Sequence, residues 1–196
     1  MHINSHFAIG VIIASISHHY FNFNLIEFLL IVISSFICDL DVFFSKRAKD
    51  NNHRNLFTHS IIPSIVIIVI GLIINWPALI FSGVAYFVHV FADIFDWGTN
   101  LFYFPKKTIG PRLFLSKEEE ENLEEHLAQF KSPASFFDFK YYTNKIALSI
   151  ELSLFILMMI SIVLLAFIYF WIFLIYFPLL YFHLSRHFHL KKLENS

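Results

Sequence analysis

The chain has 196 residues, of which 57% are hydrophobic and 15% are charged, and its mean hydropathy is +0.64. Soluble domains usually contain about 45–50% apolar and about 25% charged residues. The polar residues are therefore too few to cover a water-soluble fold, and the net charge of −1 gives no indication of a nucleic-acid partner. The one cysteine, Cys38, excludes an intramolecular disulfide and a cysteine-based zinc site, so we expect any metal to be bound by His, Asp or Glu.

Four apolar segments in the first half of the chain predict membrane helices: residues 5–19, 25–38, 61–74 and 78–95. A membrane-spanning helix needs about 20 mainly apolar residues, so the first of these is a thin or partial span. No Lys or Arg precedes it, and it therefore lacks the charged start of a secretory signal. Asn75-Trp76-Pro77 predicts a turn between the last two segments, because proline begins a helix well and disfavours continuing one.

Residues 96–145 form the longest polar section, and residues 116–130 within it predict a short amphipathic helix. Ser116 is a favourable N-cap, and the glutamates that follow suit the first turn of a helix. Leu123, Leu127 and Phe130 share one face at helical spacing. We expect this segment to lie on the cytoplasmic side, at the membrane surface or on the core.

Residues 146–183 are almost continuously apolar, which is far longer than the hydrocarbon core of about 30 Å requires at about 1.5 Å per residue. Two spans with a tight turn near residues 169–171 are the simplest solution, and one long helix kinked at Pro178 is the alternative. The predicted fold is therefore an all-α, polytopic membrane bundle of about six transmembrane helices. It forms a single domain, 1–196, with a core (1–115), a cytoplasmic amphipathic segment (116–145) and a C-terminal helical hairpin (146–184).

The distribution of charge predicts the orientation of the chain in the membrane. If six helices alternate, all 14 Lys and Arg residues fall on the side that holds both termini and residues 39–59 and 93–145. The opposite turns, near residues 18–24, 75–77 and 170, contain none. Because basic loops of membrane proteins lie on the cytoplasmic side, we expect an inner or plasma membrane protein with both termini in the cytoplasm.

The same topology gathers ionisable side chains at the cytoplasmic end of the bundle. They flank the ends of the first four helices: His6, Asp39, Asp41, His53, His59, His89 and Asp93. His89 and Asp93 are four residues apart, so one helix face presents both to a single ion. Imidazole and carboxylate are ligands for Zn²⁺, Mn²⁺ or Fe²⁺. Singly, each residue has a structural explanation as a cap, a hydrogen-bonded pair or an interfacial side chain, but together they predict a metal site.

Four segments in order resemble the YdjM-type family of inner-membrane metal-dependent hydrolases. They are Asn-Ser-His6-Phe-Ala-Ile-Gly10, Cys38-Asp39-Leu-Asp41, His53-Arg54-Asn-Leu-Phe-Thr58-His59-Ser60 and His89-Val-Phe-Ala-Asp93. The resemblance covers roughly residues 1–115. The chain departs from the pattern at Cys38, where the family has proline, and at Asn55, where it has glycine. Neither change removes a candidate ligand, but the second affects the loop that presents His53.

The resemblance implies a metal-dependent hydrolase, with Zn²⁺ the expected ion, and a distant similarity to zinc phospholipase C suggests phosphoester hydrolysis. We expect Asp39 or Asp41 to act as general base and Arg54 to bind a phosphate or carboxylate. A site at the membrane boundary suits an amphiphilic substrate among the membrane lipids. Two alternatives stay open: a non-catalytic membrane module with a structural metal site, and a metal or proton transporter.

Overall fold

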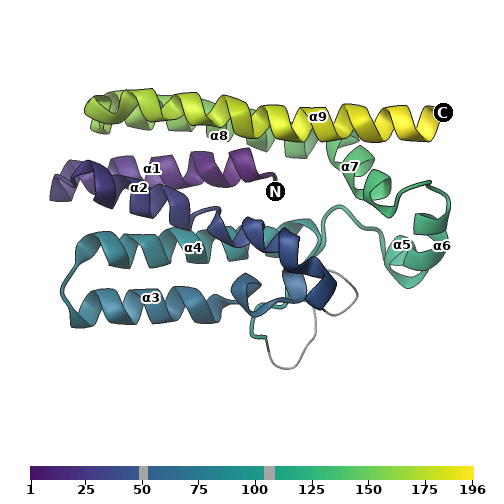
Figure 1. The fold of residues 1–196 in the computed structure, drawn as a ribbon, viewed down its shortest axis with the longest axis horizontal. Coiled ribbons are helices and arrows are strands. Elements are labelled where there is room, and N and C mark those ends of the chain that lie inside the picture. Colours follow the sequence, from purple (N-terminus) through teal and green to yellow (C-terminus); the bar gives the residue numbers. More distant parts are fainter. Residues whose placement is uncertain (49–52, 104–108) are drawn as a thin grey trace.

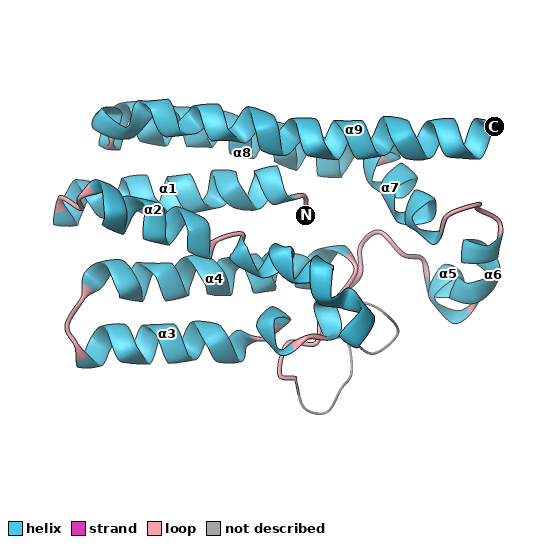
Figure 2. Cartoon of the chain, in the orientation of Figure 1, coloured by secondary structure: helices cyan, strands magenta, loops and turns pink. Residues whose placement is uncertain are grey.

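The computed structural model describes residues 1–48, 53–103 and 109–196, and these residues form helices connected by loops (Figures 1 and 2). Long helices lie side by side as a bundle: α1 (Ile3–Phe21), α2 (Leu25–Ser34), α3 (Ile61–Ile73), α4 (Pro77–Asp96), α8 (Lys145–Leu165) and α9 (Tyr176–Asn195). No strand occurs within the described ranges, where the only β-type pairing is an isolated bridge between Thr99 and Ile109. The predicted all-α fold is confirmed at this level.

Local sequence signals set the boundaries of the first four helices. Asn24 and Glu27 form a capping box at the start of α2, and the Ser60 hydroxyl accepts a hydrogen bond from the backbone of α3. Pro77 opens α4, as the Asn75-Trp76-Pro77 turn predicts, and Asn75 adopts a left-handed conformation with φ of 53°. Asparagine tolerates this conformation better than most residues. These turns make consecutive helices antiparallel.

The second apolar segment does not form one helix over residues 25–38. α2 ends at Ser34, and a separate 3₁₀ helix, η1 (Ile37–Arg47), carries Asp39 and Asp41. The hydroxyl groups of Ser34 and Ser35 donate to carbonyls within α2, and serine side chains that bond back in this way disturb a helix. The two aspartates therefore lie on η1 rather than at the end of α2.

The C-terminal hairpin forms, but its turn lies earlier than residues 169–171. α8 ends at Leu165, Ala166 leaves the helical conformation, and η5 (Phe167–Ile175) leads into α9. The single long helix kinked at Pro178 is wrong, because Pro178 instead occupies the first turn of α9, where its missing N–H costs nothing.

The polar section differs from the single amphipathic helix expected over residues 116–130. Ser116 and Glu119 form the expected capping box, but the helix breaks at Asn122 into α5 (Lys117–Glu121) and α6 (Leu123–Ala128). A further helix, α7 (Pro133–Thr143), buries Phe136 and Tyr141 and contacts α8 and α9. We did not predict α7, because its apolar residues show no one-sided pattern.

Among the described residues, three helical segments are long and apolar enough to cross a membrane: Pro77–Asp96, Lys145–Leu165 and Phe167–Asn195. α2 and α3 are apolar but shorter, with 10 and 13 residues. At about 1.5 Å per residue they reach about 15 and about 20 Å, less than a hydrocarbon core of about 30 Å. α1 packs against α2, α4, α8 and α9, with Phe7, Ala8, Val11 and Ala14 in the main hydrophobic core.

Candidate metal centre

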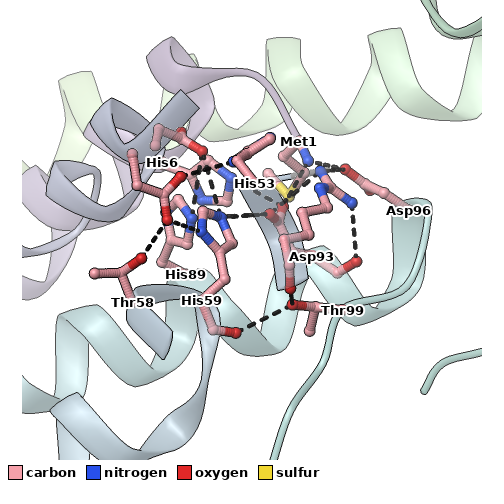
Figure 3. Close-up of polar contacts among 12 residues, drawn as sticks. Met1, His6, His53, Thr58, His59, His89, Asp93, Asp96 and Thr99 are labelled. Atoms are coloured by element: carbon pink, nitrogen blue, oxygen red, sulfur yellow. Dashed lines mark hydrogen bonds and ion pairs between the residues drawn. The ribbon is translucent and has the colours of Figure 1, made fainter. Parts of the chain in front are cut away.

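The fold brings the predicted ligands together at one end of the bundle (Figure 3). They come from the start of α1, from η1, from the short 3₁₀ turns η3 (His53–Asn55) and η4 (Phe57–His59), and from the last turns of α4. Close packing of α1 on the end of α2 makes this possible. A Cβ on Gly10 would lie 2.1 Å from Ser35 Oγ, so glycine is needed at this contact.

The innermost group consists of side chains whose ligand atoms all lie within 4.8 Å of one another: His6, Asp39, His89 and Asp93. His6 Nε2 is 3.3 Å from Asp93 Oδ1, and His89 Nε2 is 3.5 Å from Asp39 Oδ1 and 3.8 Å from Asp93 Oδ2. His6, His89 and Asp93 are almost completely buried, whereas the Asp39 side chain is 18% exposed. Two carboxylates and two imidazoles that converge in this way fit a divalent cation.

His59 adds a fifth donor atom to this group. Its Nε2 lies 3.6 Å from Asp93 Oδ2 and 3.8 Å from Asp39 Oδ1. Its other nitrogen, Nδ1, is 2.8 Å from Asp41 Oδ2. His89 has the same arrangement, since its Nδ1 is 2.7 Å from the carbonyl oxygen of Ser35. A hydrogen bond from Nδ1–H fixes the ring and leaves the Nε2 lone pair for an ion, as in most metal-binding histidines.

Buried polar atoms without hydrogen bonds test whether the residues fit an ion. Within the described part of the chain, such atoms include several that belong to these five side chains: His6 Nε2, Asp39 Oδ2, His59 Nε2, His89 Nε2 and Asp93 Oδ2. Buried polar groups normally have partners, because an unsatisfied one costs about 1–3 kcal/mol. Several atoms of the types that bind Zn²⁺ lack a hydrogen bond in side chains whose ligand atoms lie close together, and these residues therefore fit a metal ion.

Asp41 and His53 lie to one side of this centre and form a second group with His59. Asp41 Oδ1 is 2.9 Å from His53 Nδ1, and Asp41 Oδ2 accepts from Thr58 as well as from His59. Burial raises the pKa of Asp41, but the hydrogen bonds from His53 and His59 outweigh it and hold the pKa well below its usual range. Both oxygens of Asp41 are therefore engaged in orienting neighbours.

Two cationic groups neutralise the carboxylates of α4. The guanidinium of Arg54 lies 3.2 Å from Asp93 Oδ2 and 3.8 Å from Asp96 Oδ2. The α-amino group of Met1 is 3.0 Å from Asp93 Oδ1 and also contacts Asp96. Arg54 thus pairs with the carboxylate of Asp93 in this structure, and its contact with a substrate stays a prediction.

Charge also sets the protonation of the groups outside the membrane helices. Burial lowers the pKa of His59, but its contacts with Asp41 and Asp93 outweigh this and raise the pKa to about 9. Burial raises the pKa of Asp39, but the nearby His89 and His6 outweigh this and lower it. Without an ion, His59 therefore carries a proton that a metal must displace to bind its Nε2.

Several members of the site were missed by the sequence reasoning. The Ser35 carbonyl orients His89, the Thr58 hydroxyl donates to Asp41, and the hydroxyl of Tyr86 donates to the Thr58 carbonyl. Cys38 Sγ lies within 4.8 Å of ligand atoms of His59 and His89, although its single occurrence had seemed to exclude it. Burial and the nearby carboxylate of Asp39 raise the pKa of the thiol, which disfavours the thiolate that binds metals.

Comparison with known proteins decides the family. The YdjM inner membrane protein family matches residues 1–177. The chain belongs to this family. The match extends past residue 115, where the recognisable motifs end, and so includes α7, α8 and η5 of this YdjM protein. No curated protein and no solved structure matches the chain, and the similarity to zinc phospholipase C remains an analogy of ligand types.

Proposed function

We propose that this YdjM protein is a membrane-bound, metal-dependent hydrolase whose substrate is an amphiphilic phosphoester. The observation that carries the proposal is the convergence of orphaned Nε2 and carboxylate atoms from α1, η1, η4 and α4. The proposed ligands of one divalent ion, most simply Zn²⁺, are His6, Asp39, His59, His89 and Asp93. Such an ion, when bound, polarises a phosphoryl group and makes water nucleophilic near neutral pH.

The remaining polar residues have supporting parts in this proposal. Asp41 orients His59 and His53, and Arg54 holds Asp93 in place. The general base is better sought in His53 or Asp39 than in Asp41. Their side chains are 23% and 18% exposed, whereas both oxygens of Asp41 already accept hydrogen bonds. His53, paired through Nδ1 with a carboxylate, has the arrangement typical of a proton-transferring histidine.

The position of the site favours an amphiphilic substrate over a soluble one. His89 and Asp93 belong to a helix long and apolar enough to cross a membrane, near the end that carries η1. We propose that this end faces the cytoplasm, because the Lys and Arg residues concentrate there in the sequence. The predicted six spans then require α2 and α3, with 10 and 13 residues, to be thin spans covered by longer neighbours.

A transporter is less well supported. Transport requires polar groups along a path through the bundle. Beyond the cluster, the core around α1 and α2 is filled by Phe7, Val11, Phe28 and Ile31, all at most 1% exposed.

A non-catalytic module, in which the ion only joins helices, remains the second candidate, because the ligands come from separate elements and an ion would tie them together.

Two measurements on detergent-purified protein test the proposal. Elemental mass spectrometry should find about one Zn²⁺ per chain, as a single set of donors requires, and His89→Ala and Asp93→Ala should lose it. Hydrolysis of lipid phosphoesters should then disappear with a chelator and return with Zn²⁺. Bound metal without any metal-dependent turnover over a panel of lipid phosphoesters would favour the non-catalytic module. Absence of bound metal after reconstitution would refute both.

A further inference from the structure

The outer face of η1 is a surface that no described helix of the bundle covers and that contributes no residue to the metal centre. While Asp41 on this helix is buried, its neighbours are strongly exposed: Leu40 and Val42 at 45%, Phe43 at 80% and Phe44 at 54%. Phe57, on η4 next to η1, is 46% exposed. Two exposed cations follow directly, Lys46 and Arg47. A soluble surface would not present two adjacent phenylalanines in this way.

The position of η1 along the bundle indicates what covers this face. α2 and α4 begin at the same end, where Trp76 Nε1 donates to Glu27 at 2.8 Å. α4 has 20 residues and rises about 30 Å, whereas α2 has 10 and rises about 15 Å. η1 therefore starts about halfway along the length of α4 and ends near the level where α4 ends (Figure 1). This level is the expected level of the lipid headgroups.

The residue types on η1 match this level. Phenylalanines bury their rings at the boundary of the acyl chains, and neighbouring Lys and Arg bind anionic headgroups. Arg47 also lies 5.6 Å from the ring centre of Phe44, so the charge and the aromatic group occupy the same edge. We propose that η1 is an interfacial anchor: Phe43 and Phe44 insert into the leaflet, and Lys46 and Arg47 bind the headgroups of anionic phospholipids.

This anchor adjoins the open side of the metal cluster. Asp39 lies on η1 itself and His53 is bonded to Asp41 on the same helix, and these two are among the more exposed residues of the cluster. A headgroup held by Lys46 and Arg47 therefore lies beside the cluster. That this arrangement supplies substrate rests on the proposed function, whereas the insertion of η1 does not.

Spin labels on single cysteines test the insertion without any activity assay. Phe43→Cys and Phe44→Cys are labelled in the purified full chain in nanodiscs of phosphatidylcholine with phosphatidylglycerol, and accessibility to oxygen and to a water-soluble nickel chelate is measured. Leu157→Cys, on a lipid-facing turn of α8, and Glu124→Cys, on α6, are the lipid and water controls. The parent protein is the labelling blank, because its Cys38 is buried.

Labels at positions 43 and 44 should be accessible to oxygen and protected from nickel, at a depth shallower than position 157. Raising the phosphatidylglycerol fraction should move both labels deeper into the membrane. Adding the double change Lys46→Gln and Arg47→Gln should make the depth of the labels independent of the phosphatidylglycerol fraction. Nickel accessibility equal to that at position 124 would overturn the proposal. So would protection from both reagents, which would indicate that a second copy or another protein covers this face.

Discussion

Replacing Asp41 by asparagine separates the orientation of a ligand from metal binding itself. Asp41 accepts from His53 on one oxygen and from His59 and Thr58 on the other. An asparagine of the same size offers one oxygen and one NH₂ group, so at least one of these donors would face another donor. Because His59 then loses the partner that fixes its ring, we expect Zn²⁺ affinity to fall by about 10–100-fold, or about 1.4–2.8 kcal/mol.

The assay is a competition titration with a chromogenic Zn²⁺ chelator on detergent-purified protein. Asp41→Asn should keep the wild-type stoichiometry and lose affinity. Asp138→Asn is the matched control, because Asp138 pairs with His187 in a similar carboxylate–imidazole contact of 2.5 Å outside the cluster. A wild-type stoichiometry of two ions that falls to one in Asp41→Asn would refute the reasoning, since Asp41 would then be a ligand of a second ion. An unchanged affinity would refute it as well.

Three further variants address proton transfer, charge and packing. His53→Gln should retain Zn²⁺ and lower turnover by about 10²–10⁴-fold, as measured by chelator-sensitive phosphoesterase assays. Arg54→Ala should lower the free energy of unfolding by about 3–5 kcal/mol, because it removes the guanidinium paired with the buried carboxylate of Asp93 and leaves that carboxylate only the Met1 α-amino group. Thermal unfolding should show a smaller loss when Zn²⁺ is bound. Gly10→Ala should cost about 1–3 kcal/mol and reduce Zn²⁺ content, because the new methyl group would overlap Ser35.

The residues of the site could be predicted from the sequence because a membrane restricts where charge is tolerated. Successive helices in an apolar chain run in opposite directions across the membrane. Ionisable residues at the helix ends on one side of the membrane therefore meet at one end of the bundle. The order of the apolar segments alone predicts that these residues meet, and the structure brings together His6, Asp39, His59, His89 and Asp93.

The separate roles of the two η1 aspartates could not be predicted in the same way. In an α-helix, residues two apart differ by about 200°, whereas in a 3₁₀ helix they differ by about 240°. Asp39 turns towards His89, and Asp41 turns towards His53 and His59. The two aspartates separate in this way because α2 ends at Ser34. The helix ends there because the hydroxyl groups of Ser34 and Ser35 donate to carbonyls of α2 and because Ser35 packs against Gly10. A hydrophobicity pattern contains neither interaction.

The same limits apply to α7 and Cys38. α7 forms because specific partners exist for it: Tyr141 donates to Glu151, and Lys140 reaches Glu119 and the Phe114 carbonyl. None of these contacts leaves a periodic trace in the sequence. Cysteine counting excluded Cys38 as a ligand, because it considers sulfur-rich sites and ignores one thiol that packing places beside two histidines.

The balance of buried charge argues for an ion over a purely structural cluster. A set of side chains that only joined helices would be expected to satisfy its own hydrogen bonds, since an unsatisfied buried group is costly. Asp41 behaves in this way, with both oxygens bonded. Asp39 Oδ2 is buried without a hydrogen bond, Asp93 Oδ2 has only its ion pair with Arg54, and the Nε2 atoms of His59 and His89 beside these carboxylates have no hydrogen bond either. A divalent cation satisfies both kinds of atom at once, so metal binding should stabilise the protein, and removal of the ion should destabilise the α1–α4 end of the bundle more than the α8–α9 hairpin.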